Sequence, residues 1–579
     1  MNAEHLLTHF DRLADAPDAI PRLRRFILDL TVRGKLVEQD PEDELAGELL
    51  KKIAPEKQRL VAEGKFKSLD TTELDNEAEH VPFTIPANWV WCRLDDIAAI
   101  ARGGSPRPIK AYLTDDKDGI NWIKIGDSDR GSIYINETKE KIRPDGLKKS
   151  RMVFPNDLIL SNSMSFGYPY ILNIQGCIHD GWLVIRTPDG LLDKLFLYNL
   201  LLSSHSRNTF SNAAAGAVVQ NLNADKVRQL PVPLPPLAEQ HRIVAKVDEL
   251  MAVCDRLETA RKEREATRDR LVTASLARLN ASDPGPAVFQ NHAAFALNNL
   301  TPLTTRPDQI KALRQTILNL AVRGKLVEQD PEDEPAGELL RRVAAEKKRL
   351  VEAGEIRKLR MLSLTDEAPF DIPPSWEWRA LGEIVHLENG DRSKNYPSGG
   401  DIKTMGIPFF NTKNVSDYAV KFDQLDFITE EKFKSLRSGK MKDLDILITL
   451  RGSVGKLGLF QATEQFTTGF INAQLLIVRN IECSLVRFCL TFMKSQVFLN
   501  QIFARSSGST TPQLSASQLA EVLIPLPPLA EQRRIVAQVD ELMVVCDRLE
   551  AGLAAGEKTR GRLVEAVLHE TLATGRPEV

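Results

Sequence analysis

The sequence predicts an α+β protein built from two similar halves, in each of which a mixed α/β domain is carried by long helices. Three observations support this fold class. Long segments of the 579-residue chain recur after about 290 residues, the recurring segments have the apolar spacing of helices, and the segments between them resemble short strands. So long a period indicates a duplicated multi-domain unit, because solenoid repeats have only about 20 to 50 residues.

The duplication is clearest in two constant segments. Residues 33–50 (RGKLVEQDPEDELAGELL) differ from residues 323–340 at one position in eighteen. Residues 234–258 (LPPLAEQHRIVAKVDELMAVCDRLE) differ from residues 526–550 at three positions in twenty-five. Solvated positions are retained together with apolar ones, so we expect these segments to form a frame that meets the same kind of partner twice.

Each frame encloses a variable insert. Residues 92–220 and 379–512 have diverged until only fragments align, such as DLIL at 157–160 and DILI at 445–448. Two unlike inserts on two nearly identical frames predict that the protein faces two different targets. The alternative is a recent duplication whose inserts drifted without purpose.

The first constant segment and the residues before it predict two successive helices. Apolar residues recur at helical spacing and stop before Gly34 and Gly324, which fit C-terminal caps. Asp40 and Asp330, each followed by proline, fit the N-cap of the next helix, and the acids after them suit its dipole. The apolar positions are Ile20, Leu23, Phe26, Ile27 and Leu30, and Ile310, Leu313, Ile317 and Leu320.

The second constant segment predicts a long coiled-coil helix, because its apolar seam alternates steps of four and three residues. From Leu237 to about Leu279 the helix would measure roughly 60 Å. The stretch DPGP at 283–286 ends it and begins a linker to about residue 305. We expect the two long helices to run antiparallel, to bury their seams against each other and to separate the inserts. The seams are Ile243, Val247, Leu250, Cys254 and Leu257, and Ile535, Val539, Leu542, Cys546 and Leu549.

The inserts have the pattern of mixed α/β domains. Short apolar runs are separated by clusters of glycine, proline, asparagine and aspartate. The predicted strands include 120–125, 132–135 and 182–186 in the first insert, and 407–410, 445–450 and 475–479 in the second.

Several insert loops combine arginine, lysine, asparagine or serine with glycine. Such side chains bond phosphates and base edges, and glycine lets a backbone approach closely. Some of the loops pair by position across the halves, which favours polynucleotide contact; the alternative for each loop alone is an ordinary surface turn. The candidate DNA-contacting residues are Arg102, Gly103, Gly104, Ser105, Arg107, Lys110, Lys124, Arg130, Arg392, Ser393, Lys394, Asn395, Lys413, Asn414, Arg451, Ser453, Lys456, Ser509 and Thr510.

Catalytic and metal-binding signatures are missing from the sequence. There is no G-x-x-x-x-G-K-[ST] phosphate loop, no N-P-P-[FY] or D-P-P-[FY] tetrapeptide and no C-x-x-C pair among the six cysteines. No run approaches the roughly 18 apolar residues of a membrane span, and the N-terminus lacks the pattern of a secretory signal. We therefore expect a cytoplasmic protein. The net charge of −3 by itself argues against a nucleic-acid partner.

Three motifs occur once in each half. The first is RGKLVEQDPEDE with a downstream E-K-x-R-L, the second is the insert opener (PFTIPANWVWCRL and PFDIPPSWEWRAL), and the third is the insert end (LPVPLPPLAEQHRIV and LIPLPPLAEQRRIV). With these motifs the chain resembles, over essentially its whole length, the specificity subunit of a Type I restriction-modification system. The W-x-W opener followed by a PLPPLAEQ ending, twice at this spacing, is highly specific.

The resemblance implies two target recognition domains and conserved helices between them. It divides the chain into an N-terminal helical segment (1–80), target recognition domain 1 (81–233), a central conserved helix (234–282), a linker and second helical segment (283–368), target recognition domain 2 (369–525) and a C-terminal conserved helix (526–579).

The resemblance also implies a function. Each recognition domain would read one half of a bipartite, asymmetric sequence in double-stranded DNA, while the helices would set the spacing and dock two methyltransferase subunits. Restriction subunits, which translocate and cleave DNA, would join that core. S-adenosylmethionine, ATP and magnesium would bind to these partners, so the chain is expected to be a non-catalytic subunit without a cofactor of its own. A DNA clamp shared with the partners would explain the near-neutral charge.

Family loop motifs map unevenly onto the inserts. Residues 102–106 (RGGSP) match the family's Gly-Gly-[Ser/Thr]-Pro loop, whereas 389–392 (NGDR) in the second insert lack the glycine doublet. Residues 451–453 match an Arg-Gly-Ser motif, whereas 161–164 (SNSM) have no arginine. The alternative functions are a helical adaptor that binds proteins without reading DNA, and an enzyme whose catalytic site has no recognisable motif.

Overall fold

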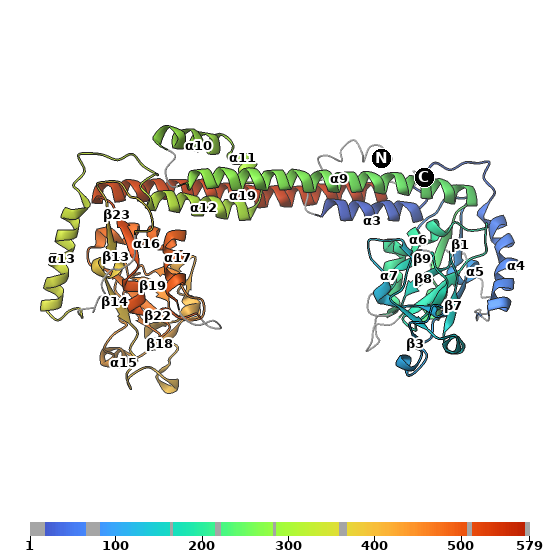
Figure 1. The fold of residues 1–579 in the computed structure, drawn as a ribbon, viewed down its shortest axis with the longest axis horizontal. Coiled ribbons are helices and arrows are strands. Elements are labelled where there is room, and N and C mark those ends of the chain that lie inside the picture. Colours follow the sequence, from blue (N-terminus) through green and yellow to red (C-terminus); the bar gives the residue numbers. More distant parts are fainter. Residues whose placement is uncertain are drawn as a thin grey trace. The chain divides into compact units, whose positions relative to one another are not determined.

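The computed structural model describes residues 18–64, 66, 82–162, 166–214, 222–281, 285–357, 368–506 and 512–573 (Figure 1). The chain forms two compact units, one made of Met1–Arg264 with Glu557–Val579 and the other of Glu265–Gly556. Two long helices, α9 (Leu237–Leu279) and α19 (Leu529–Ala573), contribute residues to both units. No helix in these ranges is long and apolar enough to cross a lipid bilayer.

The first helix predicted for each frame, which we expect to end before a glycine, is present in the structure. Helix α3 (Ala19–Val32) ends just before Gly34, and α12 (Pro307–Val322) ends just before Gly324. Both glycines have positive φ, +63° and +67°, where a side chain would strain the backbone. A Cβ at Gly34 would also collide with Pro86, so the glycine lets the start of the insert pack closely on the frame.

The second frame helix starts later than the acidic residues predicted. Helices α4 (Ala46–Gly64) and α13 (Ala336–Glu352) begin six residues beyond Asp40 and Asp330. The prediction that these aspartates cap the helices is wrong. Asp40 instead accepts the backbone N–H of Glu42 in a tight turn (3.0 Å), and that turn leaves the carboxylate of Asp43 paired with Arg242 of α9 (2.7 Å).

A short two-stranded sheet joins the start of each insert to its end. In unit 1, β1 (Val90–Arg93) pairs antiparallel with β12 (Pro231–Leu234). In unit 2, β13 (Glu377–Ala380) pairs in the same way with β23 (Leu523–Leu526). The W-x-W opener and the PLPP ending are therefore neighbours in space, which makes each insert a closed excursion from the frame.

A buried carboxylate in the first turn of each long helix fixes this junction. Glu239 of α9 is fully buried and accepts hydrogen bonds from the side chains of Trp89 (2.9 Å) and Gln39 (2.7 Å). Burial raises the pKa of Glu239, and the bonds from Trp89 and Gln39 partly offset that rise. Glu531 of α19 accepts the equivalent bonds from Trp376 and Gln329, and burial raises its pKa as well.

The first insert, the predicted recognition domain 1, contains two five-stranded sheets in the described residues. In spatial order one sheet has β2 (Ala99–Arg102), β11 (Trp182–Arg186), β8 (Leu158–Ser161), β9 (Pro169–Leu172) and β5 (Tyr134–Ile135). The other has β3 (Leu113–Thr114), β6 (Glu140–Ile142), β4 (Ile120–Ile123), β10 (Gly176–Ile178) and β7 (Arg151–Val153). The α-helices in the described part of this domain are α5 (Leu94–Ile97), α6 (Lys194–Leu202), α7 (Ser204–Ala214) and α8 (Ala224–Arg228).

The second insert, the predicted recognition domain 2, has a six-stranded and a three-stranded sheet in its described residues. The larger contains β14 (Val385–Asn389), β22 (Leu475–Asn480), β19 (Ile446–Thr449), β20 (Leu457–Leu459), β17 (Tyr418–Val420) and β16 (Val415–Ser416). The smaller contains β18 (Asp426–Ile428), β15 (Ile407–Phe410) and β21 (Phe470–Ile471). Its helices are α14 (Leu381–Ile384), α15 (Glu430–Ser435), α16 (Val486–Lys494), α17 (Gln496–Arg505) and α18 (Ala516–Ala520).

The few fragments that align between the inserts hold an ion pair inside the main sheet. Arg186 on β11 donates from Nε to Asp157 (2.7 Å), and Arg479 on β22 donates from Nε to Asp445 (2.8 Å). Both aspartates are buried, so loss of either partner would leave a charge uncompensated inside the domain. This cost explains why DLIL and DILI remain alike while the surrounding sequence differs.

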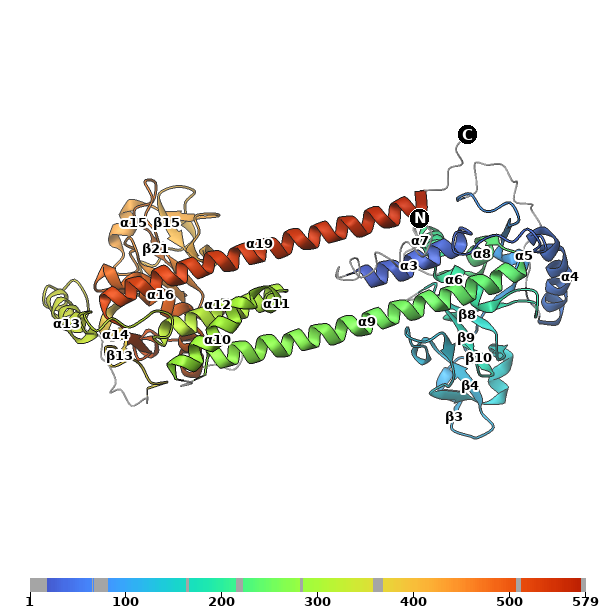
Figure 2. The same cartoon turned by 90° about the horizontal axis from the view of Figure 1, so that it is seen from above.

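The apolar seam of each long helix is buried against the first frame helix of the same half. Ile243, Val247 and Leu250 of α9 share one core with residues of α3, which lies along α9 (Figure 2). Ile535 and Val539 of α19 share another with residues of α12. The seam pattern thus predicted burial correctly, and within each unit the first frame helix packs on the seam. Ion pairs of Arg24 with Asp255 (2.6 Å) and Glu258 (3.0 Å) reinforce the first of these contacts.

The segment predicted as a linker contains two helices, α10 (Pro286–Asn298) and α11 (Leu300–Leu303). Apolar residues of α10, Phe289, Ala293 and Ala296, pack against Val272 and Leu276 near the end of α9. Their spacing of three and four residues is helical, but the proline and glycine before them indicated a loop.

Candidate nucleic-acid interface

The predicted loop after β2 forms part of a cavity of about 870 Å³ in the first recognition domain. Four candidate residues line it: Ser105, Arg107 and Lys110 from this loop, and Lys124, which directly follows β4. The remaining lining residues are Pro106, Pro108, Ile109, Leu113, Trp122, Glu140, His179 and Asp180. Arg102, Gly103 and Gly104 lead directly into this loop.

Asp180 holds the loop in shape. Its carboxylate accepts a hydrogen bond from the Ser105 hydroxyl (2.7 Å) and lies 3.5 Å from a guanidinium nitrogen of Arg107. Its backbone carbonyl accepts from Nε of Arg102 (2.9 Å). The bond from Ser105 lowers the pKa of Asp180 despite partial burial, so the anion persists at neutral pH. The Arg107 side chain remains 82% exposed and can reach a ligand.

The glycine doublet allows the loop to pass close to neighbouring backbone. A Cβ at Gly103 would collide with the carbonyl of His179, and one at Gly104 would lie 2.7 Å from the carbonyl of Lys149. In the second domain Gly390 holds the position of Gly103, because a Cβ there would lie 2.7 Å from the carbonyl of Asn472. Only the first glycine is thus required in both domains.

Arginine and lysine at the rim of this cavity suit an anionic polymer. Arg107 and Lys110 are exposed, whereas Lys124 pairs with Glu140 (2.6 Å). Burial lowers the pKa of His179, so its imidazole adds no charge at neutral pH. Arginine and lysine side chains positioned in this way neutralise phosphates, and the adjoining polar groups can bond base edges.

Arg130 does not line this cavity. Its guanidinium lies 4.9 Å from the ring centre of Tyr168, and the guanidinium of Arg207 lies 4.2 Å from the same centre. The three side chains form a separate cationic and aromatic cluster beside the turn between β8 and β9.

The matching loop of the second domain, Arg392 to Asn395, follows β14. Asp391 is buried and accepts the backbone N–H groups of Ser393 and Arg437 (both 2.7 Å). Arg392 donates to the carbonyl of Ala473 (3.2 Å), and strand register places Ala473 where the first domain has Asp180. Arginine thus bonds the same backbone position in both domains, although it comes from a different place in each loop. Lys394 is exposed, and the Asn395 amide donates to the carbonyl of Ser435.

Lys413 and Asn414 lie in a turn after β15. Lys413 is 3.6 Å from Asp426 and remains partly available. Asn414 is 1% exposed, donates to the carbonyl of Asp423 (3.0 Å) and accepts the N–H of Asn411 (3.0 Å). Its amide therefore holds the turn together inside the domain.

Arg451, Ser453 and Lys456 lie in the turn between β19 and β20. The hydroxyl of Thr449 donates to the carbonyl of Ser453 and accepts the N–H of Lys456 (2.9 Å), which shapes the turn. Ser161 accepts the N–H of Tyr168 (3.0 Å) in the same way in the first domain. The two further candidates, Ser509 and Thr510, lie outside the described residues.

Sequence reasoning missed most residues that line cavities in these domains, among them four with polar groups. Asp180 and His179 line the first, and Tyr418 and Lys494 line a second cavity beside Lys456. An acid such as Asp180 is not expected at an anion site, and its role in holding Ser105 depends on a contact 75 residues away. Tyr418 and Lys494 carry no local motif. Within the ranges described, no group of three or more histidine, cysteine or acidic residues could hold a metal ion.

Residues 86–267 and 373–555 each match the family model of the Type I restriction modification DNA specificity domain. The chain is 32% identical to the Type I restriction enzyme EcoAI specificity subunit of Escherichia coli, over 95% of this chain and 93% of that protein. It is also 32% identical to the EcoEI specificity subunit of the same organism, over 96% and 94%. A crystal structure of the HsdS subunit from Thermoanaerobacter tengcongensis shows 20% identity and a TM-score of 0.44, over 86% of this chain and 99% of that one. The protein belongs to the family of Type I restriction-modification specificity subunits, with one DNA specificity domain in each half.

Proposed function

We propose that this protein is the sequence-reading subunit of a Type I restriction-modification complex, in which each recognition domain binds one half of a bipartite, asymmetric target in double-stranded DNA. One observation carries the proposal: the frame contacts recur in both halves, whereas the surfaces they carry differ. The bond from Trp89 to Glu239 is repeated by Trp376 and Glu531 at the same 2.9 Å. By contrast, loops at equivalent positions differ: Asp180 holds the first domain's loop through Ser105, whereas Asp391 holds the second domain's loop through backbone N–H groups.

DNA binding would combine positioning with reading. Exposed cations such as Arg107, Lys110 and Lys456 would neutralise phosphates and fix the register of each domain on the duplex. Polar side chains in the same loops would then bond base edges in the groove. Because the loops differ, the two halves of the target would differ in sequence.

The frames would dock two methyltransferase subunits, one to each half. Exposed residues with no part in either core are identical in both copies of the long-helix segment, among them Glu249 with Glu541 and Arg256 with Arg548. Core packing does not require such identity, whereas a partner that meets the same surface twice does. Methyl transfer from S-adenosylmethionine, and ATP-driven translocation and cleavage by restriction subunits, would belong to those partners.

Genome-wide methylation mapping in a host that carries or lacks this protein tests the proposal. We expect one bipartite sequence to be methylated only when the protein and its methyltransferase subunits are present. Gel shifts of the assembled complex at a fixed salt concentration should show preference for that sequence. A helical adaptor would show no sequence preference, and methylation of DNA by the purified chain alone would identify it as an enzyme.

A further inference from the structure

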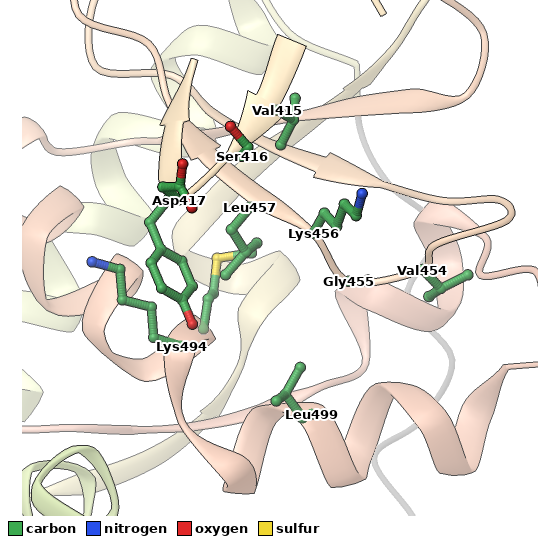
Figure 3. Close-up of a pocket in the computed structure, with 11 residues that line it drawn as sticks. Val415, Ser416, Asp417, Val454, Gly455, Lys456, Leu457, Lys494 and Leu499 are labelled. Carbon is green, nitrogen blue, oxygen red and sulfur yellow. The ribbon is translucent and has the colours of Figure 1, made fainter. Parts of the chain in front are cut away.

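A second cavity, of about 450 Å³, opens in the second recognition domain beside the Arg451 to Lys456 turn (Figure 3). Its volume lies within the range of about 300 to 1,000 Å³ typical of ligand sites. Lys456 comes from the turn before β20 and Lys494 from the end of α16. Apolar side chains, including Leu457 and Leu499, form much of the lining, and the ring of Tyr418 forms another part.

The two lysines give this cavity an unbalanced positive charge. Among the described residues, neither Lys456 nor Lys494 has a carboxylate within 4 Å. Asp417, the one acid in the lining, pairs with Lys421 (3.7 Å). Asp540, whose charge acts on Lys494, lies 3.2 Å from Arg487. Burial lowers the pKa of Lys494, and an incoming anion would relieve that cost of burying a charge.

Tyr418 is held at the cavity by a strained turn. Asp417 and Tyr418 have φ values of +52° and +61° and form the two-residue turn between β16 and β17. Such turns favour asparagine and glycine, and a bulky tyrosine there is unusual. The strain keeps a ring that is 44% exposed at the cavity, with the ammonium of Lys494 4.6 Å from its centre. Strain of this kind accumulates at binding sites.

The first domain has different side chains at the equivalent place. Gly167 and Gly455 occupy the same position, since each donates its N–H to the carbonyl of the residue that shapes the turn, Ser161 or Thr449. Tyr168 therefore stands where the second domain has Lys456. A Cβ at Gly167 would contact Arg207, whereas one at Gly455 would contact Leu499.

Arg207 is already engaged within the first domain. Its guanidinium stacks on Tyr168 and donates to the carbonyls of Phe166 (3.3 Å) and Gly167 (3.2 Å). Leu202 occupies the position of Lys494, because each directly precedes a buried serine, Ser203 or Ser495. Leucine adds no charge at this position. At a position that the two domains share, the second domain thus has a cavity lined by two lysines, where the first has the stack of Arg207 on Tyr168.

We propose that this cavity holds a short segment of the DNA backbone, with one phosphate beside Lys456, the next beside Lys494, and the deoxyribose between them against Tyr418 and Leu499. The inference rests on the proposed function and adds a contact that belongs to the second half of the target only. Because a phosphate carries no sequence information, this contact would add affinity and register without changing the bases that are read.

The salt dependence of binding tests this assignment. Two variants, Lys456→Ala and Lys494→Leu, are made in the full chain and assembled with its methyltransferase subunits. The second variant has the residue that the first domain has at the equivalent position. Each should reduce the slope of log affinity against log salt by about 1, with the same sequence preferred. Lys348→Ala, which removes an exposed lysine of α13, should leave the slope unchanged. An unchanged slope in both cavity variants, or a changed base preference, would overturn the assignment.

Acetylation of lysines in the unmutated complex gives an independent readout that does not depend on variant folding. Target duplex should protect Lys456 and Lys494 from acetylation more than inorganic phosphate does, as measured by mass spectrometry. Protection by phosphate with none by bound duplex would contradict a DNA contact. If the wild-type complex shows no sequence-specific binding at all, the proposed function fails; if it binds and these lysines stay reactive, only the present inference fails.

Discussion

The indole N–H of Trp89 donates a 2.9 Å hydrogen bond to the carboxylate of Glu239, which lies 150 residues further along the chain. The bond ties the start of the first insert to the first turn of α9, and Trp376 and Glu531 repeat it in the second half. The two inserts, whose sequences differ most, are thus attached by contacts that are the same in both halves. Such an attachment lets an insert change its surface while its fixation to the helix stays the same.

Trp89→Phe should destabilise the first unit by about 1 to 3 kcal/mol, because it leaves the buried Glu239 carboxylate short of a donor. Trp91→Phe is the matched control, since Trp91 is half-buried and packs against Phe83 with a ring distance of 5.0 Å. Urea unfolding of the full chain measures both. Equal losses for the two variants would show that ring size, not the hydrogen bond, matters at Trp89.

His179→Asn should weaken the pH dependence of stability between pH 7 and 5. Burial lowers the pKa of His179 below its ordinary value of 6.5, so the unfolded chain takes up the proton first as the pH falls. Stability is therefore present above pH 6.5 and is lost as the pH falls toward the folded pKa, by at most about 1.4 kcal/mol per pH unit.

Asparagine is the residue at the equivalent position of the second domain, Asn472, so the substitution should fold. His205 and His386 also have lowered pKa values and keep their contribution. The free energy of unfolding, measured at several pH values, should thus show a smaller slope rather than none. A slope identical to wild type would exclude a buried neutral imidazole at this site.

Gly103→Ala should distort the loop that carries Ser105 and Arg107, because the added methyl group would collide with the carbonyl of His179. We expect a loss of about 1 to 3 kcal/mol in stability and weaker binding of the first half of the target. Gly126→Ala is the control in the same domain, since a Cβ there meets nothing within 4 Å. Thermal unfolding measures the stability of both variants, and half-site binding measures their affinity. Equal stability and equal affinity of the two variants would refute the prediction.

Four extra residues near Ala260 test whether α9 acts as a ruler. They add about one helical turn, or roughly 6 Å, to the helix. The gap between the two methylated half-sequences should lengthen by one or two base pairs, at about 3.4 Å each. Methylation mapping reads this gap directly, and a gap of unchanged length would remove the ruler hypothesis.

Local patterns predicted the regular elements well. The predicted helix from Leu237 to about Leu279 matches α9, and the predicted strands 182–186 and 407–410 match β11 and β15. These elements carry their own signals, since apolar spacing depends on residues only a few positions apart. The helix start at Asp40 failed because a competing turn and the pair between Asp43 and Arg242 use the same acids.

Contacts between distant residues lay beyond local patterns. A seam of spacing four and three predicts that Ile243 and Val247 are buried, but it does not identify α3 as the surface that covers them. Likewise, the Gly-Gly-Ser-Pro loop indicated a binding site but not Asp180, which is 75 residues from Ser105. The chemistry of the second cavity depends on Tyr418 and Lys494, whose proximity arises only from the fold.

The most direct test of two unlike reading domains on one repeated frame is exchange of a single insert. Residues 92–220 would be replaced by the corresponding insert of another family member, with Trp89 and Glu239 kept in place, and the methylated sequence would be mapped across the genome. We predict a new sequence in one half of the target, with the other half and the gap unchanged. Alteration of both halves, or of neither, would contradict the account.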